Sequence, residues 1–449
     1  MRYRRTPDTN FGNQRGTGNI MIPVPLFDSK FLIELTEACA ETANRRHWEQ
    51  REKTNPWGAV KPEITHNGRA ADACPANSFF SGRSLSWNRT QTGRHALMKQ
   101  LRNTVIRAGL EALYFSGAHY LLRPIFAGVG AIFMLHHVRP CSCAEFQPNH
   151  HLEVEPDFLR AMLAHLRTLD VDIVAMDEVH QRLSERNFAR RLACFTLDDG
   201  YRDNRDFALP VMREFDAPLT VYVASDFAEG IGRLWWVALE MVIAKASSIE
   251  APIGGVATRF DISTAAAKQA AFDRLHDWLR SLPGEHDLQR EISALCARHG
   301  VDESRIGRDL CMSWDELKEF ANDPLVTIGA HTITHCNLAK QSEATASFEI
   351  AASRARIEAE LQRPVLHLAY PYGDKIAAGP REFALARAAG FKTAVTTRPG
   401  MIFPESAGHL TALQRVSLNG NYQDERIIPV LTSGAATAVW NGFRRIDAA

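Results

Sequence analysis

Short apolar runs alternate with amphipathic stretches along most of the chain after about residue 128. Apolar runs bounded by turn residues indicate buried strands, and apolar positions that recur every three or four residues indicate helices. This alternation predicts a parallel sheet connected by helices. The predicted strands are 130–135, 172–175, 193–197, 219–224, 326–329, 365–369, 393–396 and 413–417, and the helices between them include 156–169, 205–215, 314–321, 342–362 and 381–389.

Strands separated by helices in this number predict an α/β fold, an irregular (β/α) barrel. Ser313 and Glu316 have the spacing of a capping box at the start of one helix, and Gly390 stands where a glycine ends another. Residues 230–309 interrupt the alternation with a mostly helical pattern that is too long for one crossover. We interpret them as an inserted helical subdomain or lid.

The two ends of the chain differ from this pattern. Residues 1–97 are rich in Arg, Asn, Thr, Gly and Pro, and apart from one apolar-periodic island at 31–48 we expect a poorly structured extension. Residues 98–127 predict an amphipathic helical lead-in, and Met98 is an alternative start of the chain. We expect the barrel over 128–425 and a tail over 426–449.

Composition and charge are those of an ordinary globular enzyme. Lys+Arg and Asp+Glu balance at 52 each, which argues against a nucleic-acid partner. The eight cysteines include one C-x-C and no C-x-x-C pair, so neither a zinc ribbon nor a disulfide framework is indicated. The basic N-terminus lacks the apolar stretch of a secretory signal, and the apolar run 124–135 is too short to span a bilayer and is read as a buried strand. We therefore expect a cytoplasmic location without a transmembrane segment.

The first chemical motif is TLDDG, in which an apolar strand ends at Asp198 and Asp199. Two adjacent buried acids are costly unless a metal or hydrogen bonds compensate them. A polar strand-ending turn explains the same residues, since Asp-Asp-Gly is also good turn chemistry.

The second motif is HTITH, directly after a predicted strand. His331 and His335 can bind one metal ion. With 17 histidines in the chain, two unrelated residues at this spacing are the alternative.

The third motif is AYPYG, at the end of a later apolar run. Pro371 stiffens the backbone and Gly373 permits a turn, so a fixed backbone N–H can be presented there. Taken alone, a strand-ending turn explains this motif better. All three motifs, however, stand at the C-terminal ends of predicted strands, where barrel active sites are built. One carboxylate and two imidazoles leave positions open for water and substrate, as a hydrolytic metal requires.

In this order the three motifs resemble those of the polysaccharide deacetylases, the family that includes the chitooligosaccharide deacetylases of nodulation. The resemblance covers roughly 128–418, and MLHHV at 134–138 is similar to the opening strand of many members. It implies a hydrolase of the (β/α) barrel type that binds one divalent metal, commonly zinc, and removes acetyl groups from an N-acetylated glycan or oligosaccharide.

The resemblance also implies roles for individual residues. Asp198 matches the general base, and Asp199, His331 and His335 match the metal ligands. The backbone N–H of Tyr372 matches the oxyanion donor. Four aromatic residues could stack on sugar rings, although paired tryptophans more often pack in a core or lid: Tyr201, Tyr370, Trp235 and Trp236.

The chain departs from the family pattern in two functional positions besides the insertion. The third motif usually begins with an arginine that holds the base, but Ala369 stands there. Arg415 is a replacement that could reach the site, and we also expect it to contact the substrate. The late Leu-x-His motif ends in Arg415 instead of the histidine that acts as general acid. We expect His136 to replace that histidine, with His409 as second choice.

Three other functions remain open on the sequence. The barrel could hydrolyse a non-carbohydrate amide or cyclic imide, or it could bind carbohydrate without catalysis. A non-haem iron oxygenase also uses two histidines and a carboxylate, but it would need a jelly-roll pattern of antiparallel strands, which the strand–helix alternation does not suggest.

Overall fold

The computed structural model of the chain describes residues 101–445. The predictions for 1–97 therefore lie outside the described residues. Residues 101–115 are helical, and a second helix, α3 (Ala118–Phe126), leads into the first strand. The strand predicted within 124–135 thus begins only at Gly130, because Pro124 lies inside α3. Within 101–445, no helix combines the length and the apolar character that crossing a bilayer requires.

A closed barrel of parallel strands forms the centre of the fold. The strand order is β1-β12-β11-β10-β9-β6-β5, and β1 pairs with β5 to close the ring, while the short β4 pairs with β5 outside it. The predicted (β/α) barrel is confirmed. The strands are β1 (Gly130–Leu135), β4 (Asp172–Ile173), β5 (Leu192–Leu197), β6 (Leu219–Val223), β9 (Val326–Ala330), β10 (His367–Ala369), β11 (Thr393–Pro399) and β12 (Leu413–Ser417).

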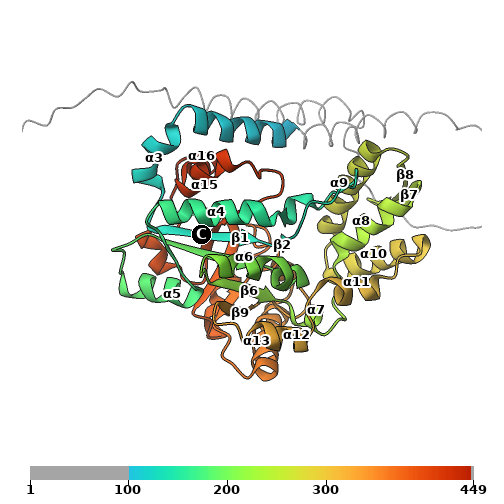
Figure 1. The fold of residues 1–449 in the computed structure, drawn as a ribbon. Helices are drawn as coiled ribbons and strands as arrows, with labels where there is room; N and C mark the ends of the chain where they lie inside the picture. The colour runs from blue at the N-terminus through green and yellow to red at the C-terminus, as the bar shows by residue number, and fades with distance from the viewer. Residues whose placement is uncertain (1–100, 446–449) are drawn as a thin grey trace, which may run out of the picture. The chain divides into compact units, whose positions relative to one another are not determined.

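Helices cover the outside of the barrel, as Figure 1 shows for α4, α5, α6 and α13. Strands β1, β5 and β6 are buried along their whole length and mostly apolar, which is why their runs were legible in the sequence. The capping box of Ser313 and Glu316 starts α12, and Gly390, with a φ of 81°, follows the last turn of α14. These helices are α4 (Pro156–Thr168), α5 (Met176–Glu185), the π-helical turn η2 (Asn204–Ala208), α6 (Leu209–Glu214), α7 (Ser225–Ala228), α12 (Trp314–Phe320), α13 (Glu343–Leu361) and α14 (Pro380–Ala388).

The insertion between β6 and β9 has an apolar core of its own, which includes Trp235, Trp236 and Phe272. Its helices are accompanied by an antiparallel hairpin with Gly254 and Gly255 at the turn, so the expected mostly helical character is incomplete. Its elements are α8 (Trp235–Lys245), β7 (Ser248–Ile253), β8 (Val256–Asp261), α9 (Ala265–Ser281), α10 (Glu285–His299) and α11 (Glu303–Leu310).

Short elements complete the fold. The segment expected as a C-terminal tail contains two helices, and their residues Val430 and Ala435 are buried against Leu110 of the lead-in helix. The remaining elements are β2 (His137–Val138), β3 (Glu153–Val154), α15 (Ile428–Thr432), α16 (Ala435–Trp440) and the 3-10 turns η1 (His150–Leu152), η3 (Leu338–Lys340), η4 (Pro404–Gly408) and η5 (Glu425–Ile427).

Candidate metal centre

Strand β5 ends in two carboxylates, and Asp198 and Asp199 are both buried. The backbone turns directly after the strand, with φ values of 74° at Asp199 and 70° at Gly200. On an extended strand these neighbours would face opposite sides of the sheet. The turn instead lets both carboxylates lie at the C-terminal end of the barrel, each with its own partners.

Asp199 lies against the two histidines of the second motif. Its Oδ1 atom is 3.5 Å from His331 Nε2 and 3.3 Å from His335 Nε2, and one ligand atom of each residue lies within 4.8 Å of the other two. Burial opposes ionisation of Asp199, but the histidines outweigh it and hold its pKa well below the usual range. Among the described residues, no donor bonds the buried Oδ1 atom. A buried carboxylate oxygen facing two imidazole nitrogens fits a divalent cation such as zinc.

Both imidazoles are oriented by their surroundings. His331 Nδ1 donates to the carbonyl oxygen of Ala369 at 2.7 Å, which directs Nε2 toward Asp199. The ring of His335 stacks on Phe227 at 5.5 Å between centroids and lies 5.0 Å from the ring of Trp236. The barrel therefore fixes one ligand, and aromatic side chains, one of them from the insertion, pack against the other.

Glu349 of α13 holds the loop that carries the histidines. Its Oε2 atom accepts from the backbone N–H groups of Ile333 (2.9 Å) and Thr334 (3.0 Å), and its Oε1 atom accepts from the Thr334 hydroxyl (2.9 Å). In that loop Thr332 and His335 have φ values of 64° and 59°, a region that non-glycine residues rarely adopt. The sequence analysis did not identify Glu349, because nothing local distinguishes it from other helix residues.

Asp198 forms a two-pronged ion pair with Arg415 of β12. Arg415 Nη1 donates to Oδ1 at 2.8 Å and Nη2 donates to Oδ2 at 2.7 Å, with both side chains buried. Arg415 also donates to the Thr396 carbonyl and the Thr196 hydroxyl. Burial alone would raise the pKa of Asp198, but Arg415 outweighs it and the pKa lies below its usual value. Arg415 thus holds the carboxylate ionised and has no free surface for a sugar.

His136 lies next to the same carboxylate, directly after β1. Its Nε2 atom is 4.0 Å from Asp198 Oδ2, and its side chain is 20% exposed, so the ring is open to a molecule that enters the site. Burial lowers the pKa of His136 despite the two aspartates, which raise it. His409 is exposed and precedes the start of β12, at the opposite end of the barrel from the metal centre, so it is excluded as the replacement acid.

Tyr372 presents its backbone at the same end of the barrel. Its φ of 61° is strained for a tyrosine, and within residues 101–445 its N–H has no hydrogen-bond acceptor. Thr397 donates to the Tyr372 carbonyl at 2.6 Å, and Trp235 of the insertion donates to the Tyr372 hydroxyl at 2.8 Å. The Arg280 guanidinium lies 4.8 Å from the centre of the Tyr372 ring. Side chains of β11 and of the insertion therefore hold this turn from two sides.

The aromatic residues considered for sugar stacking are not available for it. Tyr370 is fully buried, and its hydroxyl donates to the Thr411 carbonyl. Tyr201 is also fully buried, and its ring stacks on His137 at 3.6 Å between centroids. Trp235 and Trp236 belong to the core of the insertion, as the packing interpretation expected. We correct the substrate-contact predictions for Tyr201 and Tyr370, because neither offers a ring face to a ligand.

Comparison with known proteins agrees with the motifs. A family model described as polysaccharide deacetylase matches residues 287–394, a range that includes His331, His335 and Tyr372. The resemblance to this family is confirmed.

Several solved structures are similar to the chain at low identity. The Streptococcus pyogenes deacetylase PplD in complex with acetate is 18% identical, covers 65% of this chain and 92% of its own, and has a TM-score of 0.44. IcaB from Ammonifex degensii is 19% identical, covers 64% and 91%, and has a TM-score of 0.41. A putative polysaccharide deacetylase from Bacillus anthracis is 16% identical, covers 65% of both chains, and has a TM-score of 0.41. No curated protein sequence matches the chain.

Proposed function

We propose that the protein is a metal-dependent polysaccharide deacetylase. It would hydrolyse the acetamide of an N-acetylated polysaccharide or chitooligosaccharide and release acetate and a free amino sugar. The observation that carries this proposal is the buried cluster of Asp199, His331 and His335 beside a separate ionised carboxylate, Asp198. The family model that matches 287–394 supports the substrate class.

The metal site would have the three protein ligands and open positions of catalytic zinc sites. Bound there, the ion would supply a Lewis acid that polarises the acetamide carbonyl and lowers the pKa of water. Asp198, kept ionised by Arg415, accepts the proton of the attacking water as general base. Arg415 orients this carboxylate and is a positioning residue.

Two further groups act on the acetamide, one at its carbonyl oxygen and one at its nitrogen. The Tyr372 N–H donates to the oxyanion that forms at the carbonyl oxygen, a contact worth roughly 3 kcal/mol in comparable enzymes. His136 gives a proton to the leaving nitrogen. Because burial lowers the pKa of His136, its imidazole is neutral in the resting site and takes up the proton that Asp198 removed from water.

Variants of the metal ligands test this proposal. Asp199→Ala and His335→Ala are expected to reduce the metal content from about one ion per chain to near zero and to abolish acetate release from N-acetylglucosamine oligomers. His409→Ala is the matched control, because His409 is exposed at the other end of the barrel. Normal metal content in both ligand variants would reject the metal centre. A metal-loaded protein that binds the oligomers without releasing acetate would be a binding protein instead.

A further inference from the structure

A cluster of apolar and aromatic side chains is exposed at the end of the barrel opposite the metal centre. These side chains come from α3 and from α16 with the residues after it. A monomeric protein rarely exposes neighbouring large apolar groups without a partner for them. We call this set the apolar face: Tyr120 (67% exposed), Leu121 (78%), Ile125 (49%), Val439 (50%), Trp440 (56%) and Phe443 (52%).

The two halves of the apolar face adjoin each other. Figure 1 shows α3 beside α16, and the ring centroids of Phe126 and Phe443 are 5.7 Å apart. The backbone of Gly434, just before α16, approaches Phe126 so closely that an added Cβ would lie 2.1 Å from its carbonyl oxygen. The apolar face is therefore one surface held together by backbone packing.

The charge of these segments is strongly positive in a chain whose total charge is zero. Residues 101–126 and 435–445 contain five arginines and one glutamate, which gives a net charge of +4. Arg444 and Arg445 directly follow Phe443, and Arg123 lies between Leu121 and Ile125. Apolar side chains flanked by arginines are typical of surfaces that lie in the interface of a bilayer.

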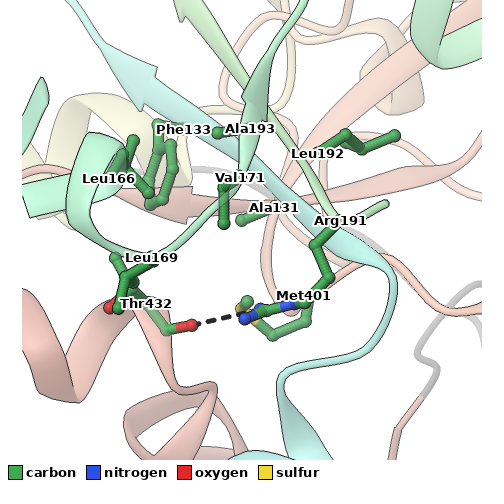
Figure 2. Close-up of a pocket in the computed structure, with 10 residues that line it drawn as sticks. All are labelled: Ala131, Phe133, Leu166, Leu169, Val171, Arg191, Leu192, Ala193, Met401 and Thr432. Atoms are coloured by element: carbon green, nitrogen blue, oxygen red, sulfur yellow. Dashed lines mark hydrogen bonds between the residues drawn. The ribbon is translucent and has the colours of Figure 1, made fainter. Parts of the chain in front are cut away.

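Two arginines at this end have no anionic partner in the part of the chain that the structure describes. Among residues 101–445, no carboxylate pairs with Arg123 or Arg191. Arg191 lies at the edge of the cavity in Figure 2 and donates to the carbonyl oxygens of Thr432 and Ala127, while its Nε and Nη1 atoms are buried with no hydrogen-bond partner among the described residues. Burial, and then the charge of Arg123, lower the pKa of Arg191 to about 10, which leaves it charged at neutral pH. The Arg191 guanidinium is enclosed by the protein, whereas Arg123 lies between exposed apolar residues of the apolar face, where its guanidinium is suited to phosphate oxygens.

We propose that the apolar face and its arginines dock the protein onto a bilayer that contains anionic phospholipids. The aromatic and aliphatic side chains would enter the boundary between headgroups and acyl chains, and Arg123, Arg444 and Arg445 would contact lipid phosphates. Neither contribution needs a helix that crosses the membrane.

The position of this surface gives the docked protein a defined orientation. Helix α3 ends just before β1 begins, and the Val129 N–H bonds the Ile402 carbonyl at this end of the barrel. Asp199 and His331 follow the opposite ends of strands that all run parallel. A bilayer on the apolar face would therefore leave the metal centre directed away from the membrane, open to a polymer in solution.

Sedimentation of the full chain with vesicles tests this proposal. The protein is expected to sediment with phosphatidylcholine vesicles that contain phosphatidylglycerol, less so at high salt, and not with phosphatidylcholine alone. Leu121→Glu combined with Trp440→Glu is expected to reduce the partition coefficient at least about tenfold, and Arg123→Gln about fivefold. The control is Phe348→Glu, because Phe348 of α13 is 64% exposed outside the apolar face and its replacement should change nothing. Circular dichroism and thermal unfolding show whether each variant is folded.

Several results would overturn the proposal. Equal binding to neutral vesicles, or equal loss of binding in Phe348→Glu, would mean that the apolar face gives no specific docking. If the protein does not sediment with vesicles, and light scattering shows a dimer that Trp440→Glu dissociates, the occupant of the apolar face is a second copy of the chain. No sedimentation and no dimer would reject lipid docking and leave the apolar face without a partner in solution.

Discussion

Replacing Arg415 by methionine removes the only cation that touches Asp198 within residues 101–445. The side chain of Arg415 is 0% exposed and that of Asp198 is 2% exposed, so water cannot solvate the carboxylate that loses its partner. Removing one partner of a buried pair costs about 3–5 kcal/mol, because the other charge stays buried and unpaired. The Thr396 carbonyl also loses its donor, which adds about 1 kcal/mol. We therefore expect the free energy of unfolding to fall by about 4–6 kcal/mol.

Urea denaturation followed by circular dichroism measures this loss without reference to catalysis. The double variant Asp198→Asn with Arg415→Met should recover about 2–4 kcal/mol relative to the sum of the single variants, since the unpaired charge is gone. Arg415→Lys is the matched control that keeps a positive charge but cannot bond both carboxylate oxygens, and its loss should be intermediate. A loss below about 1 kcal/mol in Arg415→Met, or strict additivity in the double variant, would refute the ion pair as a buried charge interaction.

Two further predictions concern the insertion and the response to acid. Trp235→Phe removes the donor to the Tyr372 hydroxyl and is expected to lower kcat about five- to tenfold, with KM and metal content unchanged. Steady-state kinetics should show the same loss of kcat in Tyr372→Phe and no further loss in the double variant. Additive losses would contradict a shared positioning role for the two side chains. Arg202 holds the pKa of Glu316 at about 2 in the folded protein, below its usual 4.5, so this carboxylate stabilises the fold above pH 4.5 and loses that effect as pH falls toward 2. Glu316→Gln should therefore lower the free energy of unfolding by about 1–2 kcal/mol at pH 7, and the difference from the parent protein should vanish near pH 2; a constant difference at all pH values would contradict the assignment.

The barrel strands were predictable from the sequence because each is marked by a short apolar run within its own residues. Strands β1, β5 and β6 are buried along their whole length and mostly apolar, and all the predicted strands are present. The hairpin of β7 and β8 was missed although its signal exists, since Gly254 and Gly255 join two segments that alternate between buried and exposed residues. The length of the helical pattern around it concealed this period of two.

The metal centre was predictable only in part. The ends of parallel strands meet at one face, so Asp199, His331 and His335 could be placed together from their positions alone. Glu349 could not be identified, because its role depends on how α13 packs against the histidine loop. The motif AYPYG also does not say which tyrosine points inward: Tyr370 is buried in the core, whereas Tyr372 meets the insertion.

Because Arg415, and not a residue at position 369, bonds Asp198, the effects of substitutions at these two positions depend on each other. Introducing arginine at Ala369, a fully buried position, would add a second guanidinium to the interior of the barrel, where both oxygens of Asp198 already bond Arg415. Introducing histidine at position 415 alone would leave Asp198 without its cation. A chain with this pair and a chain with arginine at position 369 and histidine at position 415 differ by two substitutions, and either intermediate leaves Asp198 with two guanidinium groups or with none.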